Sequence, residues 1–143
     1  MATSREEGYI LGMTPESINL NPFRQALESL RHALAQPKNE FLRDSVIQKF
    51  NFTYLLAWKA LKRYLEQEEG PESIDSLQRR DLYRMAAEKG LQEDHVIWFG
   101  YHRARNETAH THKEAKAEEV YAMASDFVND AAALLRSLEE RTS

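Results

Sequence analysis

Residues 50–66, FNFTYLLAWKALKRYLE, carry the pattern that decides the fold. Apolar side chains recur there every three or four residues, which is the spacing of one face of an α-helix. The face extends beyond this stretch and comprises Ile47, Phe50, Tyr54, Trp58, Leu61 and Leu65. We predict one long helix from Asn39 to Glu69, ended by Gly70-Pro71. Because three more apolar residues widen the arc, the helix should be central and contacted on more than one side. These three are Phe52, Leu55 and Leu56.

Similar patterns predict helices before and after this one. The first begins at Asn21-Pro22, an N-cap residue followed by proline, and Pro37 ends it. After the central helix, a shorter helix runs from Leu77 to Lys89 and closes at Gly90.

Two more helices complete the chain. Asp94 caps the first of them, which contains Gly100 and ends at Arg105. Thr111 and Glu114 have the spacing of a capping box, so the last helix starts there and continues to the C-terminus. Its near-heptad apolar stripe comprises Val120, Met123, Ala124, Phe127, Ala131, Leu134 and Leu138.

Together these helices predict an all-α fold, an antiparallel four-helix-type bundle with an additional short helix. Alternating β-branched runs and Asn-Gly hairpins, which would predict strands, do not occur in the sequence. Residues 1–20 have mixed polarity and no period, so we interpret them as an N-terminal extension. Its apolar residues 9–11 either dock on the bundle or a partner, or belong to a frayed tail. Residues 21–143 then form a single helical-bundle domain.

The composition narrows the class of protein. The chain has 143 residues, a net charge of −4 and no cysteine, which excludes a disulfide framework and a thiolate zinc site. It has no apolar run long enough to span a membrane and no signal-peptide pattern, so we expect a cytoplasmic protein without a membrane partner. A general nucleic-acid coat protein would be basic, so any contact with RNA or nucleotide should be local.

Two groups of side chains have ordinary structural explanations. Aromatic residues of the central helix could form a base-stacking platform, but at helical spacing they more often form core. Basic residues near them are most simply solvated faces, paired with Glu66, Glu68 or Asp81. The aromatic set is Phe50, Phe52, Tyr54, Trp58 and Tyr64, and the basic set is Lys59, Lys62, Arg63, Arg79, Arg80 and Arg84.

The sharpest candidate site is the junction between the last two helices, from Arg105 to His112. Arg105 would end one helix and His110 would precede the next, so both side chains would project from one corner. Histidine can act as a general acid or base near neutral pH, and arginine can hold a phosphate and stabilise developing charge. Arg105 and His110 are therefore candidate catalytic residues for metal-free phosphodiester cleavage. Spacing alone favours a structural alternative, in which Arg105 tethers helix carbonyls and His110 fills a turn.

The pair of histidines at His110 and His112 also raises the question of a metal. Two imidazoles without cysteine and without an HExxH-like spacing are a weak metal pattern. We therefore predict no metal site and no cofactor.

Two stretches resemble a known family. The run 50–66 is similar to the second-helix signature of the nucleotidyltransferase substrate-binding protein family, a branch of the HEPN superfamily of helical bundles. Residues 105–112, RNETAHTH, resemble the RNxTSHTY stretch of that family. The resemblance covers residues 21–138 and includes Asp81, Arg84, Ala86 and Trp98.

The resemblance implies a partner and an activity. Members are helical homodimers, encoded beside a minimal nucleotidyltransferase with which they form a complex, and are named for presenting its substrate. Many relatives are toxins of two-component systems. In these, an arginine and a histidine separated by four to six residues act as a metal-independent ribonuclease across the dimer. Arg105 and His110 occupy those positions here, with Asn106 as polar companion, so Asn106 and His112 become candidate nucleotide- or RNA-binding residues.

Three departures from the family pattern affect this expectation. His112 stands where members carry a tyrosine to which the partner attaches adenylate in related systems, so that mode of regulation is in doubt. Asn51 and Leu55 stand where members often carry glutamate. We therefore expect a nucleotidyltransferase-associated binding subunit, with a ribonuclease toxin as the alternative and a purely structural dimer as the third possibility.

Overall fold

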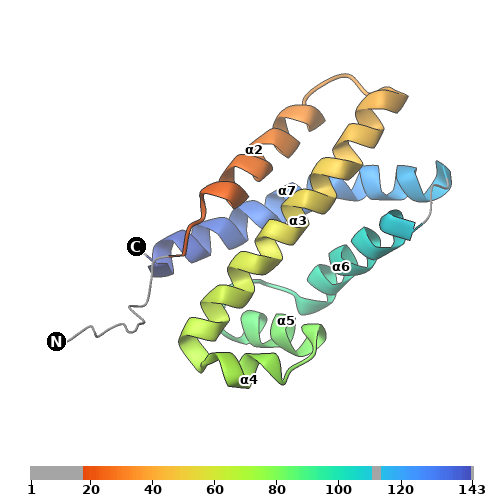
Figure 1. Ribbon diagram of the computed structural model, residues 1–143. Coiled ribbons are helices and arrows are strands. Elements are labelled where there is room, and N and C mark those ends of the chain that lie inside the picture. The colour runs from red at the N-terminus through yellow and green to blue at the C-terminus, as the bar shows by residue number, and fades with distance from the viewer. Residues whose placement is uncertain (1–17, 111–113, 143) are drawn as a thin grey trace.

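The computed structural model describes residues 18–110 and 114–142. These residues form six α-helices and no strand, which confirms the predicted all-α fold (Figure 1). The helices are α2 (Asn21–Leu34), α3 (Glu40–Glu69), α4 (Pro71–Asp75), α5 (Arg79–Glu88), α6 (His95–His110) and α7 (Glu114–Thr142). None of them is long and apolar enough to cross a membrane.

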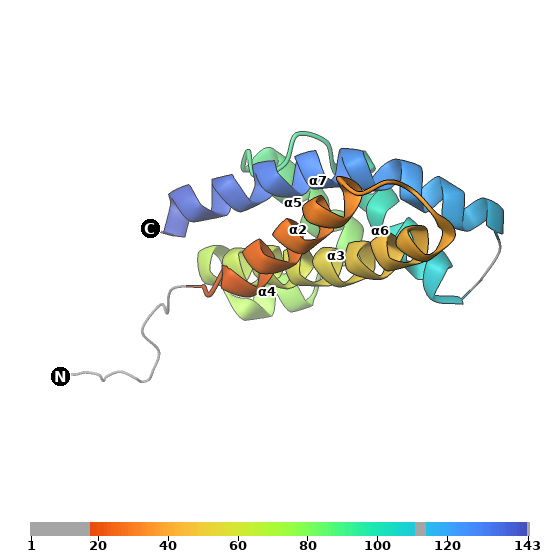
Figure 2. The same ribbon diagram turned by 90° about the horizontal axis from the view of Figure 1, so that it is seen from above.

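Helix α3 is the centre of the bundle, as its wide apolar arc predicts. It contacts each of the other five helices. Figure 1 shows α2 and α6 on opposite sides of α3, with α4 and α5 at its C-terminal end. In Figure 2, turned by 90°, α7 lies along one side of the α2–α3 pair. The site residues discussed below all lie on α3, α5 and α6 or next to them.

Local chemistry fixes the ends of α3. The Asn39 side chain accepts a hydrogen bond from the backbone N–H of Leu42 at 2.8 Å, which satisfies one of the donors left free at a helix N-terminus. Gly70 has a φ of 91°, a conformation that side-chain-bearing residues rarely adopt, and Pro71 cannot continue the hydrogen-bonding pattern. Both ends were predicted from these residues.

The core is built around large side chains of α3. Phe50, Tyr54 and Leu61 are 1% exposed or less. The Phe50 ring packs edge-on against Phe127 of α7, with ring centroids 4.9 Å apart. Burying one such side chain stabilises the fold by roughly 1.5–3 kcal/mol. The predicted stripe of α7 is buried at all its positions except Met123, which is half-buried.

Several predicted details of the helices are wrong. The cap of α2 is Leu20, and Asn21 is its first residue. The helix predicted from roughly 77 to 89 is α5, which begins two residues later and ends one residue earlier, and the short helix α4 before it was not predicted. Phe52, which the sequence assigns to the core, is 58% exposed. The proposed N-terminal extension and the capping box at Thr111 lie outside the described residues, apart from 18–20 and Glu114.

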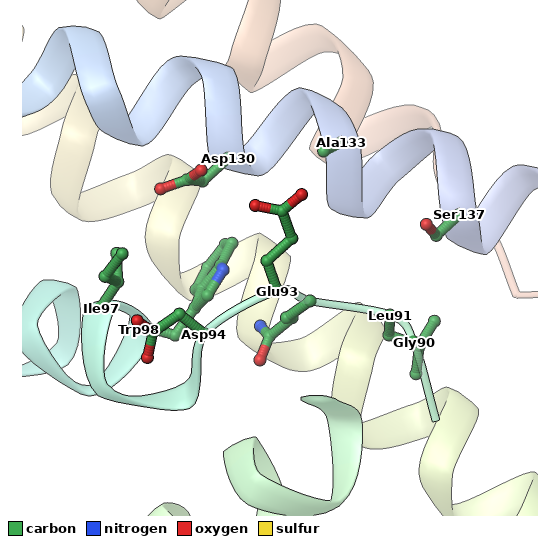
Figure 3. A pocket seen from close by; sticks show the side chains of 10 residues that line it. Gly90, Leu91, Glu93, Asp94, Ile97, Trp98, Asp130, Ala133 and Ser137 are labelled. Carbon is green, nitrogen blue, oxygen red and sulfur yellow. The ribbon is translucent and has the colours of Figure 1, made fainter. Parts of the chain in front are cut away.

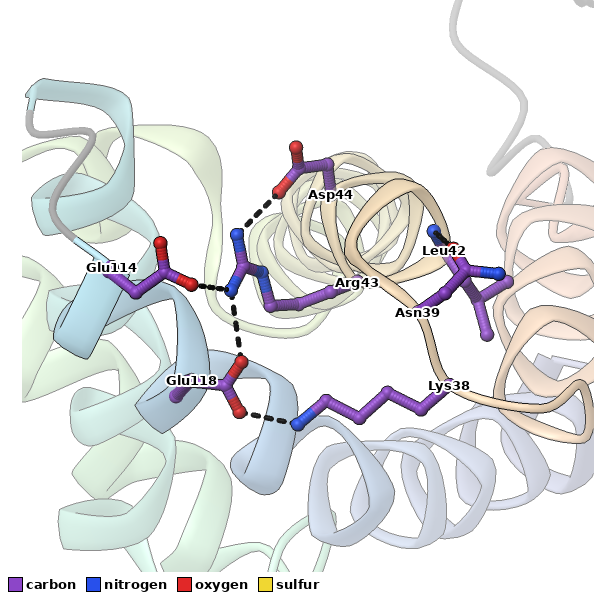
Figure 4. A network of polar contacts seen from close by, with 7 residues as sticks. All are labelled: Lys38, Asn39, Leu42, Arg43, Asp44, Glu114 and Glu118. Atoms are coloured by element: carbon purple, nitrogen blue, oxygen red, sulfur yellow. Dashed lines mark hydrogen bonds and ion pairs between the residues drawn. The ribbon is translucent and has the colours of Figure 1, made fainter.

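A polar network fastens the start of α7 to the start of α3 (Figure 4). The Arg43 guanidinium is 8% exposed and donates to Glu114 at 2.6 Å and to Glu118 at 3.0 Å. Lys38 also pairs with Glu118. These hydrogen bonds raise the pKa of Arg43, with Glu114 contributing most. Glu114 and Glu118 thus hold the starts of the two helices together.

Candidate functional site

The stretch that carries the candidate motif is helical. Helix α6 continues to His110, so Arg105 lies within it and not at its end as predicted. After Gly100 no glycine or proline occurs before the junction, and the Thr108 hydroxyl lies 3.1 Å from the Arg105 carbonyl, to which it can donate inside the helix. The helix therefore has no local reason to stop at Arg105. His110 is its last residue and is described by its backbone alone, and His112 lies outside the described residues.

This extension changes how the motif residues relate to one another. Successive residues of an α-helix are about 100° apart around its axis, so the Arg105 and His110 positions differ by about 140°. They do not share one face of α6. Positions that precede His110 by one, two or three helical turns do share a face with it. They include Phe99, His102, Arg103 and Asn106.

The opposite face of α6 is fastened to α3. The same Thr108 hydroxyl lies 3.2 Å from Asn51 Oδ1, so its proton is shared between this oxygen and the Arg105 carbonyl. Asn51 is one of the positions where the family pattern carries glutamate. Here the amide oxygen of Asn51 accepts a hydrogen bond from Thr108 of the motif helix, one turn before the junction.

His102 links the motif to its surroundings. The Asn106 Nδ2 group lies 3.2 Å from His102 Nε2, and an amide NH2 can only donate, so Nε2 accepts and the neutral ring carries its proton on Nδ1. That Nδ1 is buried and has no hydrogen-bond partner in the described part of the chain. Burial lowers the pKa of His102 below 6.5, and the nearby charges of Arg79 and Arg105 lower it further. The imidazole is therefore held neutral at pH 7.

A second cluster joins α3 and α5 beside the motif. Arg79 Nη1 donates to the Tyr54 hydroxyl at 2.9 Å, and that hydroxyl is hydrogen-bonded to the Tyr83 hydroxyl. Burial raises the pKa of both tyrosines, although Arg79 opposes the shift. The Tyr54 ring centroid lies 6.1 Å from that of His102. A neutral phenol pair thus lies between one guanidinium and the motif helix.

The basic residues of α5 differ from the solvated, ion-paired face that the sequence predicts. Arg84 does pair with Asp81, at 3.8 Å. Arg79 instead stacks on Trp58, 3.9 Å from the ring centroid, and Arg80 lies 4.5 Å above the Phe99 ring. The packing of α5 against α3 and α6 brings these aromatic rings beneath the two guanidiniums.

A cavity of about 340 Å³ lies between the 90–94 segment and α7, where Glu93 extends toward Asp130 (Figure 3). Neither Arg105 nor Asn106 lines it. Among the side chains that the structure describes, no group of three histidine, aspartate or glutamate residues is arranged to hold a metal ion.

The structure adds His102, Arg79 and Tyr54 to the residues that the sequence proposes. His102 precedes Asn106 by one helical turn, so it could have been found by counting back from the motif. Arg79 could not, because its position beside Tyr54 depends on how α5 packs. Arg105 is half-buried, and Asn106 is exposed next to His102.

Comparisons with known proteins agree on one family. The model of the family "Nucleotidyltransferase substrate binding protein like" matches residues 18–140. A Haemophilus influenzae protein named "Probable ribonuclease HepT" is 34% identical in an alignment of 142 positions, which covers 90% of this chain and 97% of that protein.

Solved structures agree as well. One from Haemophilus influenzae is described as the fold of a substrate-binding domain of a nucleotidyltransferase. It matches with a TM-score of 0.77 and 34% identity, over 85% of this chain and 99% of its own. A crystal structure from Thermus thermophilus matches with a TM-score of 0.70 and 28% identity, over 81% of this chain and 98% of its own.

Proposed function

Since the chain belongs to the nucleotidyltransferase substrate-binding protein family, we propose that it is the binding subunit of a minimal nucleotidyltransferase encoded beside it. In this proposal the two proteins form a two-component, toxin–antitoxin-like system, and the subunit presents or recognises a nucleotide or RNA. The observation that carries the proposal is the family match, which spans nearly all the described helices. The Arg105–Asn106 surface supplies the phosphate-binding chemistry that such a substrate needs.

Co-purification tests the partnership. The full chain carrying an affinity tag is co-expressed with the nucleotidyltransferase of the adjoining reading frame. We expect the untagged enzyme to co-elute in a fixed ratio, and an unrelated nucleotidyltransferase to be absent from the eluate. Failure of the neighbouring enzyme to co-elute, with both proteins soluble, would contradict the proposal.

The second candidate function is a metal-independent ribonuclease. The relative named as a probable ribonuclease favours it, as does a guanidinium at Arg105 that has no carboxylate partner among the described residues. In this mechanism His110 accepts the proton of a ribose 2′-hydroxyl, and the 2′-oxygen bonds to the adjacent phosphorus. The bond from phosphorus to the 5′-oxygen breaks, which leaves a 2′,3′-cyclic phosphate, and the departing 5′-oxygen takes up a proton. Arg105 stabilises the charge that develops on the phosphate. Asn106 and His112 would position the RNA.

The geometry of α6 favours a site that uses two copies of the chain. Because the Arg105 and His110 positions are about 140° apart on one helix, one copy presents them on different sides. A homodimer would let Arg105 of one copy act with His110 of the other. Light scattering should then give twice the mass of the chain.

His110→Ala tests the ribonuclease activity. Removing a general acid–base group typically lowers the rate by about 10²–10⁴-fold, so cleavage of a single-stranded RNA should nearly vanish in EDTA-containing buffer. His95→Ala, at the first residue of α6, is the matched control and should cleave like the parent. Equal cleavage by His110→Ala and the parent would exclude this mechanism and leave the partner-binding proposal untouched.

A further inference from the structure

The surface next to the motif combines arginines with aromatic rings. Arg79 stacks on Trp58, and both Arg80 and Arg103 lie over Phe99, at 4.5 Å and 5.8 Å from the ring centroid. We refer to these five residues as the arginine–aromatic surface. They come from α3, α5 and α6, so only the folded chain brings them together.

The guanidiniums of this surface differ from the other arginines of α5 and α6 in their surroundings. Among the residues that the structure describes, none of Arg79, Arg80 and Arg103 forms an ion pair. Glu107 follows Arg103 by one turn, but its carboxylate pairs with Lys116 at 3.0 Å. In a chain of net charge −4, this concentrates positive charge on one face. Such local charge attracts a polyanion even when the whole protein is acidic.

Stacking prepares these guanidiniums for phosphate. An aromatic ring covers one face of the guanidinium plane and stabilises its charge, while the N–H donors at the edge stay available. Those donors form a fork that matches two phosphate oxygens. Arg79 Nη1 donates one of these hydrogen bonds to the Tyr54 hydroxyl.

The surface is continuous with the motif. Phe99 and His102 have ring centroids 5.5 Å apart, and His102 contacts Asn106 of the motif. A chain with phosphates at regular intervals could therefore be bound on the arginines while one of its phosphates reaches the motif helix. Its unpaired bases could stack on the exposed guanidiniums or rings.

We propose that the arginine–aromatic surface binds the phosphate backbone of single-stranded RNA beside the Arg105–Asn106 motif. This proposal rests on the proposed function, in which RNA binds at the motif. Single-stranded RNA fits better than an acidic protein surface, because aromatic and guanidinium planes can stack on bases but have no such partner in carboxylates.

Fluorescence anisotropy with the full chain tests the proposal. The probe is a fluorescein-labelled single-stranded 2′-O-methyl oligouridylate, which lacks the nucleophile needed for cleavage. Arg80→Gln and Arg103→Gln should each weaken binding by about three- to tenfold. Each should also lower the slope of log affinity against log salt by about 0.7, the value for one lost phosphate contact on a single strand. Arg79→Gln should weaken binding and lower the salt slope in the same way. If that variant misfolds, the variants of the two exposed arginines, Arg80 and Arg103, still test the proposal.

Arg136→Gln is the matched control, because it removes the same charge from an exposed position of α7. The proposal is wrong if the surface variants bind the probe with the affinity and salt slope of this control. It is also wrong if ATP displaces the probe at equal phosphate concentration, which would assign the surface to a free nucleotide. The surface binds protein instead if the variants bind the probe normally but no longer co-purify with the nucleotidyltransferase, or no longer form the dimer in light scattering. Absence of any probe binding by the parent overturns this inference but not the partnership.

Discussion

His102 is the residue that best reports the electrostatics of the site. Its ring lies within reach of Tyr54, Phe99 and Asn106, and two guanidiniums disfavour its protonation. A neutral imidazole with a free Nδ1–H can donate a hydrogen bond to a bound phosphate. Because Nδ1 is buried, it could do so only if a ligand reached between α6 and its neighbours.

We predict that the His102 imidazole titrates below its ordinary pKa of 6.5. Arg79→Gln should raise this pKa toward 6.5 without restoring it fully, because burial contributes more than the charge. An NMR titration of the ring protons measures both values, and Arg136→Gln should leave the titration unchanged. A His102 pKa at or above 6.5 in the parent would show that the ring is not desolvated as described.

The same shift has a consequence for stability. A histidine whose pKa is lower in the folded state binds fewer protons there than in the unfolded state between the two pKa values. Its contribution to stability is therefore complete above about pH 6.5 and is lost as the pH falls from 6.5 toward the folded pKa. His102→Gln should remove this part of the pH dependence of unfolding.

At the level of helices, Gly70 and Gly100 have different roles. Gly70 has a φ of 91° and ends α3, whereas Gly100 lies in the middle of α6 with no atom within 4 Å of an added Cβ. Gly100 therefore costs α6 backbone entropy without serving a turn. The sequence already showed Gly100 as an unusual residue inside a helix.

We predict opposite effects of alanine at these two positions. Gly100→Ala should raise the free energy of unfolding by about 0.5–1 kcal/mol, since it restricts the unfolded chain and favours the helix. Gly70→Ala should lower it by about 1–3 kcal/mol, because a residue with a Cβ is strained at that φ. Urea unfolding followed by circular dichroism measures both. A destabilising Gly100→Ala would mean that this part of α6 packs against a second chain.

Across the whole molecule, α3 holds both sides of the α6–α7 junction. Asn51 receives a hydrogen bond from Thr108 before the junction, and Arg43 binds Glu114 directly after it. The two α3 residues are eight positions apart and so lie on nearly the same side of the helix. The motif helix and the start of α7 are thereby fixed relative to each other through a third helix.

Charge is also distributed unevenly over the molecule. The surface of α5 and α6 near the motif carries unpaired arginines, whereas Glu93, Asp94 and Asp130 line the cavity beside α7. An acidic net charge therefore does not exclude RNA binding at one face. The net charge excludes a uniformly basic protein, but it is a sum over the whole chain and does not show how charge is distributed among the faces of the fold.

The sequence by itself determined the helical class, the central position of α3, the ends of α3 and the family, because these depend on local periodicity, capping and motif residues. Only the tertiary structure decided that α6 runs on to His110, that Arg79 and Arg80 stack on Trp58 and Phe99, and that Phe52 faces outward. Helix periodicity is a property of neighbouring residues and can be read along the chain. The contacts of long side chains depend on how α3, α5 and α6 pack, and no spacing within one segment specifies that packing.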